Sequence, residues 1–301
     1  MATLFEQMAV PAFSGGTAVL FSHPLELTKV RLQLDNERAA AGTPRQYRGW
    51  VDCVMQNVQK DGVAGLQRGL SLGIMREVCF NAVRIGLLQP MLGGVHSVFT
   101  AAGLAEAGAS PSAAERTTAG LACGALGGCV INPVELLKTR FQAFGGLTGF
   151  QHKYEGPLSA LAELARTEGA NGMLRGLGTS TLRGLLGPGS QLVAYGELKS
   201  GAVARGYDGA SATTHVACAL ASAVVSVACV NPVDVTRTRL YNAPVGRYAS
   251  GVEAALALAR IEGPLAFYKG ALTHYLRLGP HMVLVFGIME QIKLLLAEKR
   301  K

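Results

Sequence analysis

The stretch "INPVELLKTRFQ", residues 131–142, follows a run of small and apolar residues without charge, "TTAGLACGALGGCV". A proline, an acid and a base therefore stand in fixed order where an apolar segment ends. Nearly the same pattern occurs twice more, as "SHPLELTKVRLQ" from Ser22 and as "VNPVDVTRTRLY" from Val230. Internal repetition of this kind decides an architecture, and here it predicts three related units in one chain.

Two landmarks set the period of the repeat. The prolines stand 109 and 99 residues apart, at Pro24, Pro133 and Pro232. Each unit also has two glycines seven residues apart, in "KDGVAGLQRG", "RTEGANGMLRG" and "RIEGPLAFYKG", and the second of each pair is Gly69, Gly176 or Gly270. We therefore expect a single domain over residues 1–301, made of repeats at about 5–97, 113–204 and 211–301.

The composition is typical of a membrane protein. Of the 301 residues, 49% are hydrophobic, only 16% are charged and 38 are glycine, which fits closely packed transmembrane helices. Six segments are long enough to cross a hydrocarbon layer of ~30 Å as a helix, although several carry charge. They lie near residues 8–25, 70–95, 117–137, 177–198, 213–235 and 271–296.

Charged residues are distributed unevenly between the connections. Within each unit, a polar connection follows the proline motif and contains a short amphipathic helix, as in "EGPLSALAELARTEG" and "SGVEAALALARIEG". These three connections hold 17 of the 28 lysines and arginines, whereas the connection 93–117 between two units holds only Arg116. The positive-inside rule therefore places the basic connections on one side of the membrane, and an even number of spans places both termini on the other.

The proline motif itself has two interpretations. In the first, Asn132 or Asn231 is an ordinary N-cap, with proline in the first helical turn and an acid near the positive end of the helix dipole. In the second, the helix continues through the proline and is kinked there. Three copies at one level favour the kink, because an acid and a base three residues apart can then pair between units. We expect these pairs to form a latch that closes the pore on the side of the basic loops. The latch residues are Glu26, Lys29, Glu135, Lys138, Asp234 and Arg237.

With P-x-[DE]-x-x-[KR]-x-[KR] and the glycine pair each present three times, the whole chain resembles the mitochondrial carrier family. The resemblance implies an all-α membrane protein: a three-fold pseudosymmetric bundle of six transmembrane helices with three short amphipathic helices on the matrix side. It also implies a monomer of the mitochondrial inner membrane that works by alternating access, with both termini in the intermembrane space. In that family the residue nine positions after each proline braces the ring of ion pairs, and here these residues are Gln33, Gln142 and Tyr241.

The family also has a second, cytoplasmic gate that faces the intermembrane space. Its acid and base stand 20 and 23 residues after the second glycine of each pair. These positions hold Gln89 with Leu92, Gly196 with Lys199, and Glu290 with Lys293, so only the last pair is complete. We therefore expect the resting protein to favour the conformer that is latched at the matrix side.

Arg76, Arg183 and Arg277 follow the same three glycines at an interval of seven residues. Arginine is costly within hydrocarbon, and only Glu77 is an evident countercharge nearby, so we expect the three side chains to face water or a ligand. A ring of guanidinium groups suits small planar anions, because each can hold a carboxylate or sulfate by paired hydrogen bonds. The resemblance places the family's central contact points at these arginines and at the residues after them, including Glu77. Arg84, about 80° round the helix and two turns deeper, is a further candidate.

Shorter sequence motifs narrow the expected class of substrate. "VRIGL", residues 83–87, resembles the dicarboxylate, oxoglutarate and uncoupling-protein branch, and "TRLYNAPVGRY" and "YLRLGPHMVL" resemble the oxaloacetate carrier and its orphan relatives. We expect a secondary transporter of small dicarboxylates, oxoacids or divalent inorganic anions, with oxaloacetate, malonate-like acids and sulfate as candidates. Exchange and proton-coupled uptake are both open. The alternatives are an uncoupling-like proton leak and a carrier-derived scaffold that transports nothing. A nucleotide carrier is less favoured, because only Tyr195 and Tyr275 offer an aromatic platform.

Lipid sites are expected at helix N-termini, whose backbone amides bind phosphate. The first half of each site, which resembles the family's cardiolipin-clamping motif, ends at Gly69, Gly176 or Gly270. The second half is Tyr47-x-Gly49 and Tyr154-x-Gly156, and in the third unit Tyr248 is followed by Ser250 instead. We expect cardiolipin as a bound structural lipid and no other cofactor.

The sequence does not point to an enzyme, a metal site or a nucleic-acid-binding protein. The six histidines lack metal-ligand spacing, and the six cysteines form no C-x-x-C pair and lie mostly in apolar segments, where buried thiols are expected. The net charge of +8 includes no basic stretch interleaved with aromatic residues. The expected partners are a small anionic substrate and membrane lipid.

Overall fold

The computed structural model describes residues 4–35, 37, 45–104, 110–146, 148–209 and 211–298. Within these ranges the protein is all-α and has no β-strand. The long helices have 28 to 32 residues and are α1 (Leu4–Gln33), α3 (Leu70–Ala101), α4 (Ala113–Ala143), α7 (Leu177–Ala204), α8 (Ala212–Asn242) and α10 (Ala271–Glu298). The short helices between them are α2 (Trp50–Gly65), α5 (Pro157–Thr167), α6 (Gly169–Met173), α9 (Gly251–Glu262) and the 3-10 helix η1 (Pro264–Tyr268).

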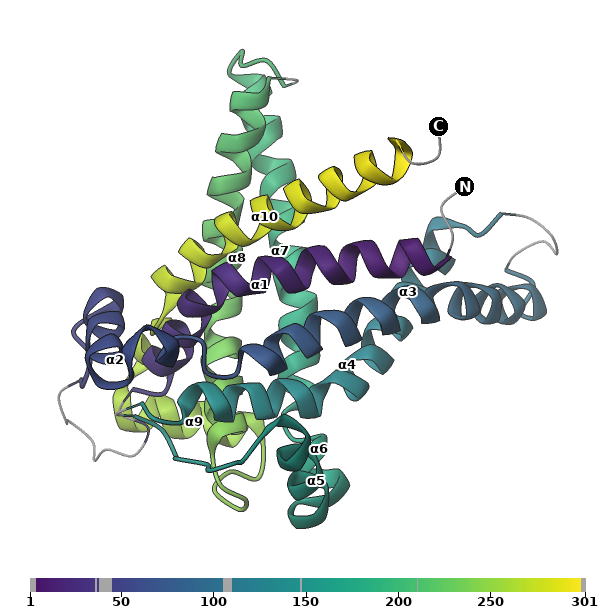
Figure 1. Cartoon of the computed structure of the whole chain (residues 1–301). Helices are drawn as coiled ribbons and strands as arrows, with labels where there is room; N and C mark the ends of the chain where they lie inside the picture. The colour runs from purple at the N-terminus through teal and green to yellow at the C-terminus, as the bar shows by residue number, and fades with distance from the viewer. Residues whose placement is uncertain are drawn as a thin grey trace.

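The long helices form a closed ring of neighbours. Each packs against the next long helix along the chain, and α10 packs against α1. In Figure 1 the short helices lie around one end of the bundle, while the α7 and α8 pair diverges from α3 and α4 toward the other end. Helix α1 begins and α10 ends on the same side of the molecule (Figure 1). The amphipathic segments predicted within the second and third units are present as α5 and α9.

Large apolar side chains cover much of the outer surface of the long helices. Phe13, Phe21 and Leu192 are 65%, 66% and 73% exposed, and many valines and leucines on α7 and α8 are also exposed. Such a surface needs an apolar partner. By length and apolar composition, residues Thr213–Asn242 of α8 form the one helix in the described ranges that could cross a membrane.

Three long helices continue through their prolines. Pro24, Pro133 and Pro232 lie inside α1, α4 and α8, so the N-cap interpretation of the motif is wrong. The amide of Asn132 instead donates across the bundle to the backbone carbonyl of Arg175 at 2.9 Å, and Asn231 donates to that of Lys269 at 3.2 Å. The Nδ2 groups of both asparagines therefore bind the turn before the next long helix, and the side chains are held away from the N-cap role.

The three landmark glycines hold the long helices close together. Gly69, Gly176 and Gly270 have φ of 80°, 71° and 73°, in the left-handed region that favours glycine, and each directly precedes a long helix. A Cβ atom on Gly176 would lie 2.7 Å from Cε1 of Tyr241 on α8, which is closer than two carbons can approach. The repeated glycine is therefore required both by the turn and by the neighbouring helix.

Candidate functional site

The acids and bases of the three proline motifs meet near the end of the bundle where the short helices lie. Nζ of Lys138 lies 2.7 Å from Oε1 of Glu26, Lys29 pairs with Asp234, and Arg237 pairs with Glu135. These pairs join α4 to α1, α1 to α8 and α8 to α4, so they form a closed triangle of ion pairs between three helices. Of these side chains, Lys29, Lys138 and Asp234 are buried, and Glu26, Glu135 and Arg237 are half-buried. Loss of the partner of a buried charge is costly.

A second set of contacts, which the sequence did not predict, joins the same helices. The residues seven positions after the prolines are Arg31, Arg140 and Arg239. Their Nε atoms each donate at 3.1 Å to a backbone carbonyl near the end of a neighbouring helix, on Gln142, Tyr241 and Gln33 respectively. The last carbonyls of a helix lack partners within the helix and lie at the negative end of its dipole. The second basic residue of the motif was visible as a repeat, but the residue pattern gave no sign of its partner, because the acceptor is a backbone atom.

The arginines expected to face a ligand lie beside this ring, and two of them are already paired. Nε of Arg76 lies 2.7 Å from Oε1 of Glu135, and Arg76 also pairs with Glu77. Nε of Arg183 lies 2.6 Å from Oδ1 of Asp234. The expectation that Glu77 is the only countercharge near these arginines is therefore wrong, because α4 and α8 bring the latch acids to α3 and α7.

Arg277 differs from the other two arginines. It is half-buried, its Nε has no hydrogen-bond partner among the described residues, and it forms no ion pair with a carboxylate described there. The side chain of the further candidate, Arg84, lies outside the described part of the chain.

A small cavity of about 60 Å³ lies between the ring and the arginines. Its charged lining consists of Glu26, Glu135, Asp234, Lys29, Lys138, Arg237, Arg76, Arg183 and Arg277. Six bases thus face three acids, and the cavity has an excess of positive charge even when Glu77 is counted. In a partly desolvated site such an excess attracts anions.

The chain matches the family model of mitochondrial carrier proteins in three segments, residues 2–92, 109–205 and 208–300. It belongs to the mitochondrial carrier family. The carrier is 33% identical over 289 residues to UCP3 of mouse (Mus musculus), a protein named as a mitochondrial transporter, covering 94% of this chain and 91% of the relative. Human (Homo sapiens) UCP3 is 32% identical, with 95% and 92% covered. The mitochondrial brown fat uncoupling protein 1 of sheep (Ovis aries) is 32% identical over 302 residues, with 98% and 94% covered. None of these three is named as an oxaloacetate carrier, so that narrower resemblance stays a prediction.

Two of the three expected brace residues of the carrier contact the ring. Nε2 of Gln33 donates to Oδ2 of Asp234 at 2.9 Å. The aromatic side chain of Tyr241 has its centroid 4.7 Å from Cζ of Arg237, in cation–π geometry. Nε2 of Gln142, in contrast, is buried without a hydrogen-bond partner in the described residues.

Ser180 is a further ring contact that the sequence did not indicate. Its hydroxyl accepts from Nε of Arg237 at 2.9 Å and lies 2.6 Å from the hydroxyl of Tyr241. The equivalent positions, four residues after the other landmark glycines, are Gly73 and His274. Because the three residue types differ, no repeat pattern could have revealed this contact.

The residues expected at the cytoplasmic gate make no described contact with one another. Gln89 is exposed and Lys199 is half-buried, and the side chains of Glu290 and Lys293 lie outside what the structure describes. Two polar contacts described near the cytoplasmic-gate positions each join a helix to the next long helix along the chain. Nδ1 of His96 on α3 is 2.7 Å from Oε1 of Glu115 on α4, and Tyr195 on α7 bonds His215 on α8 at 2.5 Å.

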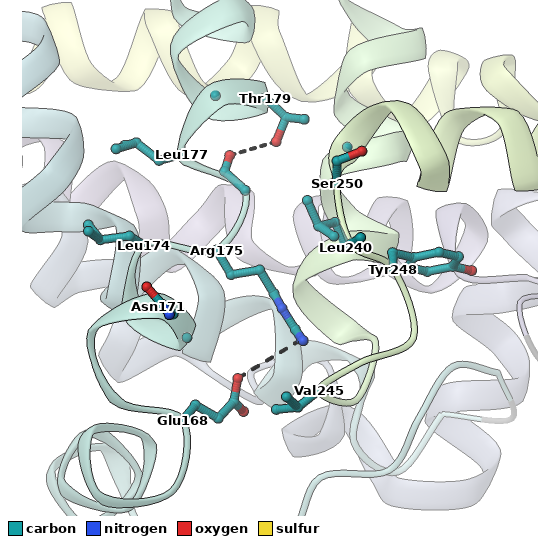
Figure 2. A pocket seen from close by; sticks show the side chains of 15 residues that line it. Glu168, Asn171, Leu174, Arg175, Leu177, Thr179, Leu240, Val245, Tyr248 and Ser250 are labelled. Carbon is teal, nitrogen blue, oxygen red and sulfur yellow. Dashed lines mark hydrogen bonds and ion pairs between the residues drawn. The ribbon is translucent and has the colours of Figure 1, made fainter.

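The predicted lipid motifs lie beside pockets on the outside of the bundle. One pocket of about 400 Å³ is lined by Arg175 and Gly176, before α7, and by Tyr248 and Ser250, before α9. Figure 2 shows Arg175, Tyr248 and Ser250 around this pocket, with the guanidinium of Arg175 directed toward Glu168. A second pocket of about 410 Å³ has Gly49 and Gly270 in its lining, before α2 and α10.

The third unit keeps the position of the clamp but changes its chemistry. Gly49 and Gly156 are the N-caps of α2 and α5 and have no side chain to accept a backbone hydrogen bond. Ser250 is the equivalent N-cap of α9, and its hydroxyl accepts from the backbone N–H of Glu253 at 3.2 Å. One of the amides that a phosphate would use is therefore already occupied.

The six cysteines, all of which lie in the described ranges, form no disulfide and differ in their environments. Cys53, Cys123 and Cys218 are buried as expected, but Cys229 is exposed, because it lies on the outer surface of α8. Burial raises the pKa of the Cys53 thiol to about 12, so it stays protonated at neutral pH. No group of three or more histidines, cysteines and acids within the described ranges could hold a metal ion.

Proposed function

We propose that this carrier moves small divalent anions across the mitochondrial inner membrane by alternating access. The observation that carries the proposal is the cavity in which three arginines, one from each unit, lie over the ring of ion pairs. Dicarboxylates, oxoacids such as oxaloacetate and malonate-like acids, and sulfate carry two negative charges and neighbouring oxygens that one guanidinium group can bind through two parallel hydrogen bonds.

The proposed architecture is a three-fold pseudosymmetric bundle of six transmembrane helices. It is supported by the closed ring of neighbours, by the three segments matched by the family model and by the apolar outer surface. The proposed carrier works as a monomer, with its basic connections in the matrix and both termini in the intermembrane space.

The ring of ion pairs is proposed as the matrix gate. With all three pairs formed, the cavity is shut toward the short helices, while α7 and α8 diverge from α3 and α4 at the opposite end (Figure 1). An incomplete cytoplasmic gate would favour this conformer in the absence of substrate. Cardiolipin in the pockets beside α2, α7, α9 and α10 is the proposed structural lipid.

A proton leak is the second candidate function. The relatives include a protein named as an uncoupling protein. Its alignment with this chain, at 32% identity, covers 98% of the carrier. Whole-chain similarity at this level favours related function without identifying the cargo.

Purified carrier reconstituted in liposomes separates these functions. Internal and external malonate, oxaloacetate and sulfate would be varied, with proton flux recorded in parallel. Arg277→Ala tests the cavity, and Arg166→Ala, on the exposed surface of α5, is a matched loss of one arginine. Anion exchange that is weakened in Arg277→Ala and kept in Arg166→Ala supports the main proposal. Proton flux without anion movement supports the leak, and inactivity in every condition supports a scaffold.

A further inference from the structure

The three cavity arginines are equivalent in sequence but not in their partners. Glu135 uses Oε1 for Arg76 and Oε2 for Arg237, and Asp234 uses Oδ1 for Arg183 and Oδ2 for Lys29. Two latch acids are therefore each shared between a latch base and a cavity arginine.

The third latch acid is not shared in this way. Oε1 of Glu26 binds Nζ of Lys138 at 2.7 Å, and Arg277, which is placed in the third unit as Arg76 is in the first, forms no described ion pair with it. The buried Nε of Arg277 is left without a hydrogen-bond partner in the described part of the chain. A buried cationic donor without a partner is energetically costly, and an anion that binds it removes that cost.

The free energy of binding an anion differs between the three arginines. At Arg76 or Arg183 it must exchange places with a carboxylate that is already bound, so one charge pair replaces another and the net gain is small. At Arg277 the anion adds an ion pair and displaces no described hydrogen-bonded carboxylate, since the charge of Glu26 acts on Arg277 without a described ion pair between them. The loss of a charge-assisted hydrogen bond typically costs 10-fold or more in affinity.

We propose that Arg277 is the principal anion anchor of the carrier and that Arg76 and Arg183 belong chiefly to the latch. This inference rests on the proposed function, because it assigns unequal roles within the same anion site. It predicts that the three arginines separate into two classes when stability and anion affinity are measured on the same variants.

The test compares Arg277→Ala, Arg183→Ala and Arg76→Ala in detergent, with sulfate and malonate as probes. The Tm without anion measures how much each arginine stabilises the folded carrier through its internal ion pairs. The anion-dependent rise in Tm gives the apparent Kd. Arg277→Ala should keep or raise the Tm without anion and weaken anion binding by about 10-fold or more. Arg183→Ala and Arg76→Ala should lower the Tm and weaken binding by less than about 3-fold.

Controls separate anchoring from general damage. Arg277→Lys keeps the charge and should recover part of the affinity, whereas Arg277→Gln should not. Arg166→Ala on α5 should change neither quantity. If Arg183→Ala or Arg76→Ala fails to fold, the corresponding lysine variants give the same comparison.

Equal affinity losses at the three arginines, or a lower Tm for Arg277→Ala than for Arg183→Ala, would overturn the inference while leaving anion transport intact. Wild-type carrier that neither binds nor transports any of the anions would overturn the proposed function, and the inference with it.

Discussion

Nζ of Lys138 on α4 lies 2.7 Å from Oε1 of Glu26 on α1, although the two residues are 112 positions apart in the chain. The lysine is buried, and its acid is the partner that makes this burial tolerable. The other two pairs of the ring repeat the relationship between α1, α4 and α8.

Removing the acid of this pair should destabilise the carrier. Glu26→Gln leaves a buried ammonium without its carboxylate, and we expect a loss of ~3 kcal/mol, seen as a lower Tm in detergent. The swapped pair, Glu26→Lys with Lys138→Glu, should recover much of the loss. Glu163→Gln on the exposed face of α5 should change stability by less than ~0.5 kcal/mol. A swapped pair no more stable than Glu26→Gln would show that the ion pair does not hold the two helices.

The landmark glycine of the second unit should not tolerate even alanine. Gly176→Ala places a Cβ atom at positive φ and 2.7 Å from Cε1 of Tyr241, so we expect a loss of at least ~2 kcal/mol. Gly178→Ala, two residues later in α7, meets no atom within 4 Å and should be neutral or stabilising by ~0.5 kcal/mol. Thermal unfolding of the two variants measures the contrast, and similar Tm values would contradict the proposed close approach of α7 and α8.

Stability should depend on the ionisation of Glu37, which follows α1 outside the spanning helices. Burial raises the pKa of its carboxyl to about 7, although a hydrogen bond from Asn242 at 3.0 Å favours the charged form. Because the folded protein holds this proton more tightly than the unfolded chain, stability should fall as pH rises from the unfolded pKa near 4.5 to about 7, and then level off.

Glu37→Gln removes that titration while keeping an oxygen that can accept from Asn242. Relative to wild type, the variant should gain ~2 kcal/mol at pH 8 and little near pH 5. Glu155→Gln, at an exposed position, should shift the Tm equally at both pH values. A Glu37→Gln effect independent of pH would contradict this assignment.

The N-cap of α9 should weaken lipid binding in its pocket. Ser250→Gly frees the backbone N–H of Glu253 and should increase the number of cardiolipin molecules retained in native mass spectrometry, at a cost of only a few tenths of a kcal/mol in helix capping.

The reverse change provides the matched control. Gly156→Ser at the N-cap of α5 has room for a side chain, because a Cβ atom there would lie 3.7 Å from its nearest neighbour. This variant should lose cardiolipin as Ser250→Gly gains it. Opposite or absent changes in both variants would show that the cap does not control lipid affinity.

The three prolines show where sequence alone stops. The triple proline motif predicted that the helices continue past their prolines and which acids and bases pair between units. It left an N-cap role open for Asn132 and Asn231, because an asparagine before a proline fits either structure. The choice depends on Arg175 and Lys269, whose backbone carbonyls lie far away in the sequence and accept hydrogen bonds from the Nδ2 groups of the two asparagines.

What the sequence determined by itself is the period of the repeat: three units, three helices that run through their prolines, the amphipathic helices and one arginine per unit at the same position. Fixed offsets along a helix convert directly into height and direction, so a repeated offset predicts a shared level. Only the tertiary structure decided the partners: Arg76 and Arg183 bind latch acids, whereas Arg277 forms no ion pair with a carboxylate in the described part of the chain. Whether an arginine reaches an acid depends on the separation and tilt of two helices that are distant in the chain, and a residue pattern along one helix carries no information about that distance.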